Sequence, residues 1–108
     1  MNLNLENKVA LVTGGGRDIG KLISLNLAAE KVSVAVNYNS SPKEAEETVS
    51  SIKKLGGNAK AYKGDISNYD EIKNTIEMIN KDFGDIDFLI NNAGYTRIER
   101  FLQSKPEE

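Results

Sequence analysis

The chain has 108 residues, the size of one small domain, and contains no cysteine and no histidine. Their absence excludes disulfides, thiolate and imidazole catalysis and nearly every zinc site, so we expect no metal centre. The net charge of −2, with both signs interspersed, argues against a nucleic-acid partner. The sequence shows neither a membrane-spanning apolar run nor a signal-peptide pattern, so we expect a cytoplasmic protein.

The first predicted elements are a strand, a turn and a helix. Residues 8–13 are an apolar strand that leads into the glycine-rich segment 14–16. Apolar side chains at helical spacing then predict a helix that ends near residue 30, with an inner face formed by Ile19, Leu22, Ile23 and Leu27. The short apolar run 32–36 is typical of a strand buried on both faces of a parallel sheet, and residues 37–41 are expected to form its exit loop.

The next helix has clear start and stop signals. Ser41 and Glu44 form a capping box around Pro42, and Gly56 ends the helix. The expected inner face consists of Ala45, Val49, Ile52 and Leu55. A third short strand follows at residues 59–62.

A third helix and a fourth strand complete the pattern. Ser67 is expected to cap the helix and Gly84 to end it, with one apolar stripe made of Ile72, Ile76, Ile79 and Phe83. A strand at residues 86–90 follows. Because short apolar strands alternate with helices, we predict an α/β fold with a Rossmann-type parallel sheet in strand order 3-2-1-4.

The end of the chain is unusual. Residues 106–108, a proline followed by two acids, are a helix-opening signal with no helix after it. The fourth strand would also be left as a bare sheet edge, which intact α/β proteins avoid. We therefore expect a sheet that is truncated after strand four.

The glycine-rich turn is typical of a phosphate-binding site. Glycine lets the backbone approach a ligand closely, and the following helix directs unpaired N–H groups at an anion. Two other interpretations remain open. The glycines could serve only the tight turn, or Gly15, Gly20 and Lys21 could belong to a P-loop, although Leu22 replaces the Ser or Thr that would hold magnesium.

Two motifs at the right separation carry a family resemblance. Thr13, Gly14 and Gly20 form the pattern T-G-(x)5-G, and residues 91–94 read N-N-A-G. The chain resembles the short-chain dehydrogenase/reductase family, with the 3-oxoacyl-carrier-protein reductases most similar. The resemblance implies the N-terminal part of a single NAD(P)-binding Rossmann domain, in which the cofactor contacts Gly14, Gly16, Arg17, Asp18, Ile19, Gly20, Asn37, Tyr38, Asp65, Ile66, Asn91, Asn92, Ala93 and Gly94.

Three of these residues have an alternative role. Asp65 is implied as the adenine contact after strand three, but it could equally cap the turn into Ser67. Asn91 and Asn92 lie where a buried strand meets the ligand crevice, so a structural hydrogen-bond role is expected beside the cofactor role.

Asp18 is a departure from the family pattern, which has glycine at this position. A carboxylate facing a pyrophosphate would weaken binding through like-charge repulsion. Aspartate is also a strong helix N-cap and tolerates unusual backbone angles. We favour the N-cap, with the side chain turned away from the ligand.

The choice of cofactor depends on two places in the sequence. Enzymes that bind the ribose 2′-hydroxyl of NAD carry an acid after the second strand, where this chain has Asn37 and Tyr38. Arg17 lies in the turn, where family members that prefer NADP resemble this chain in having a basic residue, although it could instead be a solvated surface charge. NADP is favoured, with NAD as the alternative.

No catalytic residue is assigned in this chain. Tyr69 and Lys73 match the family's Tyr-x-x-x-Lys spacing but lie upstream of N-N-A-G, and the implied serine, tyrosine and lysine are expected beyond residue 108. The chain is therefore expected to be the cofactor-binding part of an NADP-dependent reductase of a small carbonyl or 3-oxoacyl substrate, inactive alone and self-associating as a homo-oligomer. The alternative is a non-catalytic nucleotide-binding or interaction fragment.

Overall fold

The computed structural model describes residues 5–14, 16 and 18–92 and contains a four-stranded sheet in the order β3-β2-β1-β4. All three strand pairs are parallel, so the predicted α/β fold and strand order are confirmed. The elements in chain order are β1 (Val9–Thr13), α1 (Asp18–Ala29), β2 (Ser33–Tyr38), α2 (Pro42–Lys54), β3 (Ala59–Lys63), α3 (Tyr69–Phe83) and β4 (Phe88–Asn91).

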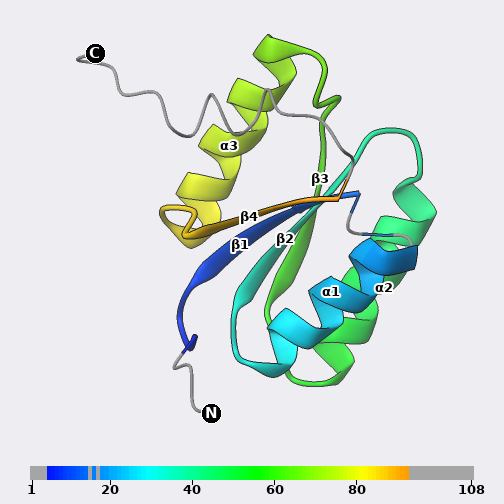
Figure 1. The fold of residues 1–108 in the computed structure, drawn as a ribbon, viewed down its shortest axis with the longest axis vertical. Helices are drawn as coiled ribbons and strands as arrows, with labels where there is room; N and C mark the ends of the chain where they lie inside the picture. The colour runs from blue at the N-terminus through cyan, green and yellow to red at the C-terminus, as the bar shows by residue number, and fades with distance from the viewer. Residues whose placement is uncertain (1–4, 15, 17, 93–108) are drawn as a thin grey trace.

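The helices form a layer on each side of the sheet. Helices α1 and α2 cover one face and α3 covers the other (Figure 1). Alternate side chains of β1 enter two separate cores, since Ala10 and Val12 pack toward α1 and α2 while Val9 and Leu11 pack toward α3. Strand β1 is therefore buried along its whole length, and the turn that follows it starts from a fixed point.

The carboxyl ends of the parallel strands lie together at one end of the sheet. Thr13, the last residue of β1, is in register with Asn37 of β2 and Asn91 of β4. Because all the strands run in one direction, the carboxyl ends of β1, β2 and β4 lie together at this end of the sheet, which is where ligands bind in open α/β sheets.

Helix α1 has an inner face that differs in part from the one predicted. Its buried residues are Gly20, Ser24 and Ala28, whereas Ile19 is 64% exposed and Leu22 58% exposed. The helix lies so close to the glycine turn that a Cβ added at Gly20 would collide with the carbonyl oxygen of Gly14. Small residues therefore face inward near the turn, and Ile19 and Leu22 face outward. Of the other predicted inner residues, Ile23 is half-buried and Leu27 packs against the core.

Helix α2 confirms the predicted start and stop but not their details. Ser41 is the N-cap and Pro42 the first helical residue, yet the side chain of Ser41 makes no capping hydrogen bond. Leu55, predicted to face inward, is 77% exposed because it lies at the C-cap. The chain leaves the helix through Gly56, whose φ of 85° favours glycine.

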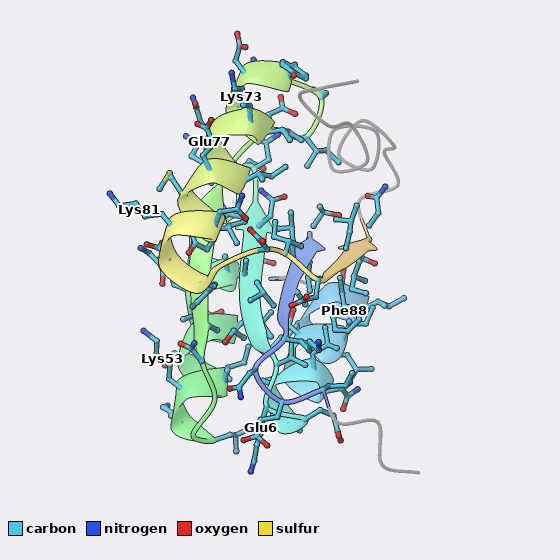
Figure 2. The ribbon with its side chains drawn as sticks, turned by 90° about the vertical axis from the view of Figure 1, so that its left-hand side faces the viewer. Glu6, Lys53, Lys73, Glu77, Lys81 and Phe88 are labelled. Atoms are coloured by element: carbon cyan, nitrogen blue, oxygen red, sulfur yellow. The ribbon has the colours of Figure 1, made fainter. Side chains whose placement is uncertain are left out.

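Helix α3 is capped one residue later than predicted. Asn68 is the N-cap, and its Oδ1 accepts a hydrogen bond from the backbone N of Glu71 at 3.2 Å. Ser67 instead donates to Asp65 in the preceding turn. The predicted end at Gly84 is confirmed, and the charged side chains of Lys73 and Lys81 project from the outer surface of the helix (Figure 2).

Strands β2 and β4 have shifted boundaries. Strand β2 continues through Asn37 and Tyr38, which were predicted to lie in a loop. Strand β4 begins at Phe88, two residues later than predicted. The preceding residue, Asp87, is bonded to Val9 partly through its side chain: its backbone N donates to the carbonyl oxygen of Val9 at 2.8 Å, and its Oδ2 accepts from the backbone N of Val9 at 2.8 Å.

Among the described residues, no helix has the length and apolar character needed to cross a membrane.

Candidate functional site

The glycine turn and the end of β4 are joined by side-chain hydrogen bonds. Thr13 Oγ1 donates to Asn91 Oδ1 at 3.2 Å, and Asn92 Nδ2 donates to the carbonyl oxygen of Gly14 at 3.4 Å. The two motifs are 78 residues apart in sequence. The structure thus brings both into one site, and it gives Asn91 and Asn92 the structural role that was expected beside cofactor contact.

Glycine is required in this turn for close packing as well as for its backbone angles. Gly14 has a φ of 63°. A Cβ at Gly16 would lie 2.7 Å from the Cα of Ala45, and one at Gly20 would lie 2.9 Å from Nδ2 of Asn92. Backbone atoms cannot move aside without a large cost in free energy. The turn is therefore packed closely against α2 at Gly16, and against α1 and the end of β4 at Gly20.

Asp18 adopts the unusual backbone angle that its sequence position suggested. It is the first residue of α1, whereas the predicted N-cap would precede the helix. It is exposed and has a φ of 48°. This is the left-handed region, which aspartate enters more readily than most residues but glycine enters without cost. The residue therefore occupies a glycine-type position, and the direction of its carboxylate relative to a bound phosphate remains a prediction.

Asn37 is a structural residue of the sheet. It is 4% exposed, and its Nδ2 donates to the carbonyl oxygens of Tyr62 at 3.3 Å and Gly64 at 3.1 Å. Both amide protons are therefore directed at β3 and the residue that follows it. Asn37 carries no negative charge at the end of β2, and its contact with a cofactor stays a prediction.

A cavity of about 140 Å³ adjoins the glycine turn. Its lining residues are Gly14, Gly16, Asn37, Tyr38, Asn39, Ser40 and Ser41. Sequence reasoning assigned Asn39 and Ser40 only to an exit loop, and Ser41 to that loop and to the N-terminal cap of the next helix. The signal that could have found them is the run of small polar residues between a buried strand and a helix N-terminus, a place that favours anions.

Asp65 stabilises its own turn. Its Oδ1 accepts from Ser67 Oγ at 2.7 Å and from the backbone N of Ser67 at 2.9 Å, and these two bonds hold the pKa of the Asp65 carboxyl below its usual range. The capping alternative is thus observed, while the adenine contact remains a prediction. Neighbouring Ile66 lines a narrow apolar cavity together with Leu11 and Gly64.

Three predicted site residues, Arg17, Ala93 and Gly94, lie outside the described residues, so their roles stay predictions. Ile19 lies beside the turn on the exposed side of α1. Within the described part of the chain, no three acidic, His or Cys side chains are grouped so that they could hold a metal ion.

Comparison with known proteins identifies the family. The family model described as short chain dehydrogenase matches residues 8–108. The chain belongs to the short-chain dehydrogenases. It is 48% identical over 95 residues to the short-chain dehydrogenase/reductase homolog YusS of Bacillus subtilis, covering 88% of this chain and 87% of that protein.

Longer relatives and solved structures agree with this assignment. The chain is 42% identical to the 3-oxoacyl-[acyl-carrier-protein] reductase FabG of Staphylococcus epidermidis over 94% of its own length, but spans only 42% of that reductase. A Burkholderia cenocepacia short chain dehydrogenase in complex with NADP superposes with a TM-score of 0.79 at 39% identity, over 85% of this chain and 38% of that one. A Sinorhizobium meliloti dehydrogenase/reductase gives 0.81 at 35% identity, over 84% and 36%.

Proposed function

We propose that this short-chain dehydrogenase chain is the cofactor-binding part of an NADP-dependent reductase of carbonyl or 3-oxoacyl substrates. The observation that carries the proposal is the hydrogen-bonded junction between the glycine turn and the end of β4, which joins both family motifs in one site. Bound NADPH would supply a hydride to the substrate carbonyl. The residues of this chain would bind and orient the cofactor.

Each part of the site fits one part of a dinucleotide. The backbone N–H groups of the glycine turn and the N-terminus of α1 would hold the pyrophosphate. Asn91 and Asn92, already fixed by their bonds to the turn, would border the nicotinamide half, and Asp65 with Ile66 would border the adenine. This assignment also includes Arg17, Ala93 and Gly94 from the family resemblance.

The preference for NADP over NAD rests on the end of β2. The strand ends without an acid, so nothing there repels a phosphate and nothing accepts from a ribose 2′-hydroxyl in the way NAD enzymes require. The adjoining cavity offers the hydroxyls of Ser40 and Ser41 at the positive end of the α2 dipole. Ser41 is available because it is not used for capping.

Calorimetric titration tests this proposal. NADPH is expected to bind at least about tenfold more tightly than NADH, which corresponds to about 1.4 kcal/mol. Arg17→Ala and Ser41→Ala are each expected to reduce this preference. Equal affinity for the two cofactors in the unmodified chain would refute the NADP assignment, and a preference for ATP with magnesium would favour the P-loop interpretation.

We further propose that the 108 residues alone bind the cofactor without reducing a carbonyl. The acid that protonates the developing alkoxide would come from outside this chain. Reduction of a 3-oxoacyl substrate that is lost in Tyr69→Phe would contradict this, because it would make Tyr69 that acid.

Self-association is proposed through the β4 edge. Strand β4 pairs with β1 on one side, and among the described residues no strand pairs with its other side. It carries no charged residue, and Phe88 lies half-buried at this edge of the sheet (Figure 2). The opposite edge, β3, carries the exposed lysines Lys60 and Lys63, which discourage pairing.

The cytoplasmic location remains a prediction.

A further inference from the structure

Thr48 of α2 contacts the glycine turn from inside the protein. Its side chain is completely buried, and its Oγ1 lies 3.2 Å from the carbonyl oxygen of Gly16 and 3.1 Å from that of Glu44. A hydroxyl has one proton, so it can donate fully to one of these oxygens at a time. The bond to Glu44 is local to the helix, whereas the bond to Gly16 joins residues 32 apart.

The carbonyl of Gly16 needs such a donor. Gly16 is buried, and its backbone lies directly on α2, because a Cβ there would meet the Cα and N of Ala45 at 2.7 Å. A buried carbonyl without a hydrogen-bond partner is costly. The hydroxyl of Thr48 is placed to satisfy it, since Thr48 follows Ala45 by one turn on the same side of the helix.

We infer that Thr48 is a positioning residue for the cofactor turn, an inference that rests on the proposed dinucleotide site. Holding the carbonyl of Gly16 fixes the orientation of one planar peptide group of the turn. Thr48 thus keeps the turn in the shape that presents N–H groups to the pyrophosphate. It acts through the backbone of Gly16 and does not touch the ligand.

Helix α2 then has two separate effects on binding. Ser41, at its start, lines the cavity proposed for the 2′-phosphate, which only NADPH has. Thr48, two turns later, acts on the turn that holds the pyrophosphate, which both cofactors have. Substitutions at the two positions should therefore produce different patterns of loss.

Calorimetric titration of four variants with NADPH and with NADH separates these effects. Thr48→Val keeps the shape of the side chain but removes the donor, and it should weaken both cofactors by the same factor, about tenfold. Thr48→Ser keeps the donor and should stay within about twofold of the unmodified chain. Ser41→Ala should weaken NADPH and leave NADH unchanged. Tyr62→Phe removes a buried hydroxyl bonded to Asp82 at 2.7 Å on the α3 side of the sheet, and it should destabilise the fold without changing either affinity.

Several results would overturn the inference. Unchanged affinity in Thr48→Val would do so, as would an equal loss in Thr48→Ser, which would indicate packing instead of donation. A loss confined to NADPH would also overturn it. If Thr48→Val does not fold at the titration temperature, Thr48→Cys replaces it, because a thiol of similar size is a weak donor. Failure of the unmodified chain to bind either cofactor would instead refute the proposed function.

Discussion

Replacement of Asp18 by glycine and by alanine gives opposite results if its backbone angle is as observed. In an ordinary helical position alanine is more stable than glycine by about 0.5–1 kcal/mol, since glycine has more conformational freedom to lose. The φ of 48° at Asp18 reverses this order, because the left-handed conformation costs a residue with a Cβ about 1–2 kcal/mol. Both substitutions remove the same carboxylate from the first turn of α1, so the lost helix-dipole term cancels in the comparison.

We therefore expect Asp18→Gly to be more stable than Asp18→Ala by about 1 kcal/mol. For a domain of this size, that difference corresponds to about 4–8 °C in the melting temperature. Urea denaturation with linear extrapolation measures it directly, and equal m-values would show that the two variants unfold to comparable states. Alanine equal to or more stable than glycine would refute the reasoning, since it would place Asp18 in an ordinary helical conformation.

Three further predictions address the turn, the α3 side and the sheet edge. Gly20→Ala should destabilise the fold by about 1–3 kcal/mol in urea denaturation, because the new Cβ meets the carbonyl of Gly14; a neutral substitution would contradict the packing described. Hydrogen bonds from Lys60 and Tyr62 lower the pKa of Asp82, so the unfolded state binds its proton first and stability should fall as the pH drops below about 4. In melting curves recorded across this pH range, Asp82→Asn should reduce the loss of stability at low pH. An unchanged pH dependence would exclude Asp82 as its source. In sedimentation equilibrium the mass of the unmodified chain should rise with concentration and that of Phe88→Lys should not; a monomer throughout in the unmodified chain would refute pairing at the β4 edge.

The order and type of the elements could be predicted because several signals agree. Strand β1 and strand β2 are short and have apolar centres, at residues 9–12 and 34–36, which is how buried parallel strands are recognised. Gly56 and Gly84 end their helices with positive φ angles of 85° and 99°. Cap residues are less certain, since Ser67 and Asn68 are adjacent and both suitable, and only the fold decides which one faces the helix N–H groups.

The packing of α1 could not be predicted from hydrophobic periodicity. Periodicity selects Ile19 and Leu22 because they are large, but the helix approaches the glycine turn so closely that Gly20 and Ser24 must face inward. The distance between two elements is a tertiary property, and it overrides the local pattern. A glycine and a serine four residues apart were the available signal.

The candidate site was predicted in its motifs but not in its supports. Glycine spacing and N-N-A-G are local patterns and can be read directly. A structural role for Asn92 was expected, but its partner, the carbonyl of Gly14, depends on how β4 lies against the turn. The bond from Thr48 to Gly16 and the cavity that Ser41 lines depend in the same way on the position of α2. Such contacts between distant segments carry no local signature.

The central claim is that the turn between β1 and α1 holds the pyrophosphate of a dinucleotide, and NMR of the amide groups during titration with NADPH tests it most directly. The account predicts that the largest changes occur at the backbone amides of Gly14, Gly16 and Gly20 and at the side-chain amide of Asn92, all saturating at one cofactor per chain. Changes confined to the outer faces of α2 and α3, with the glycine amides unmoved at saturation, would contradict it.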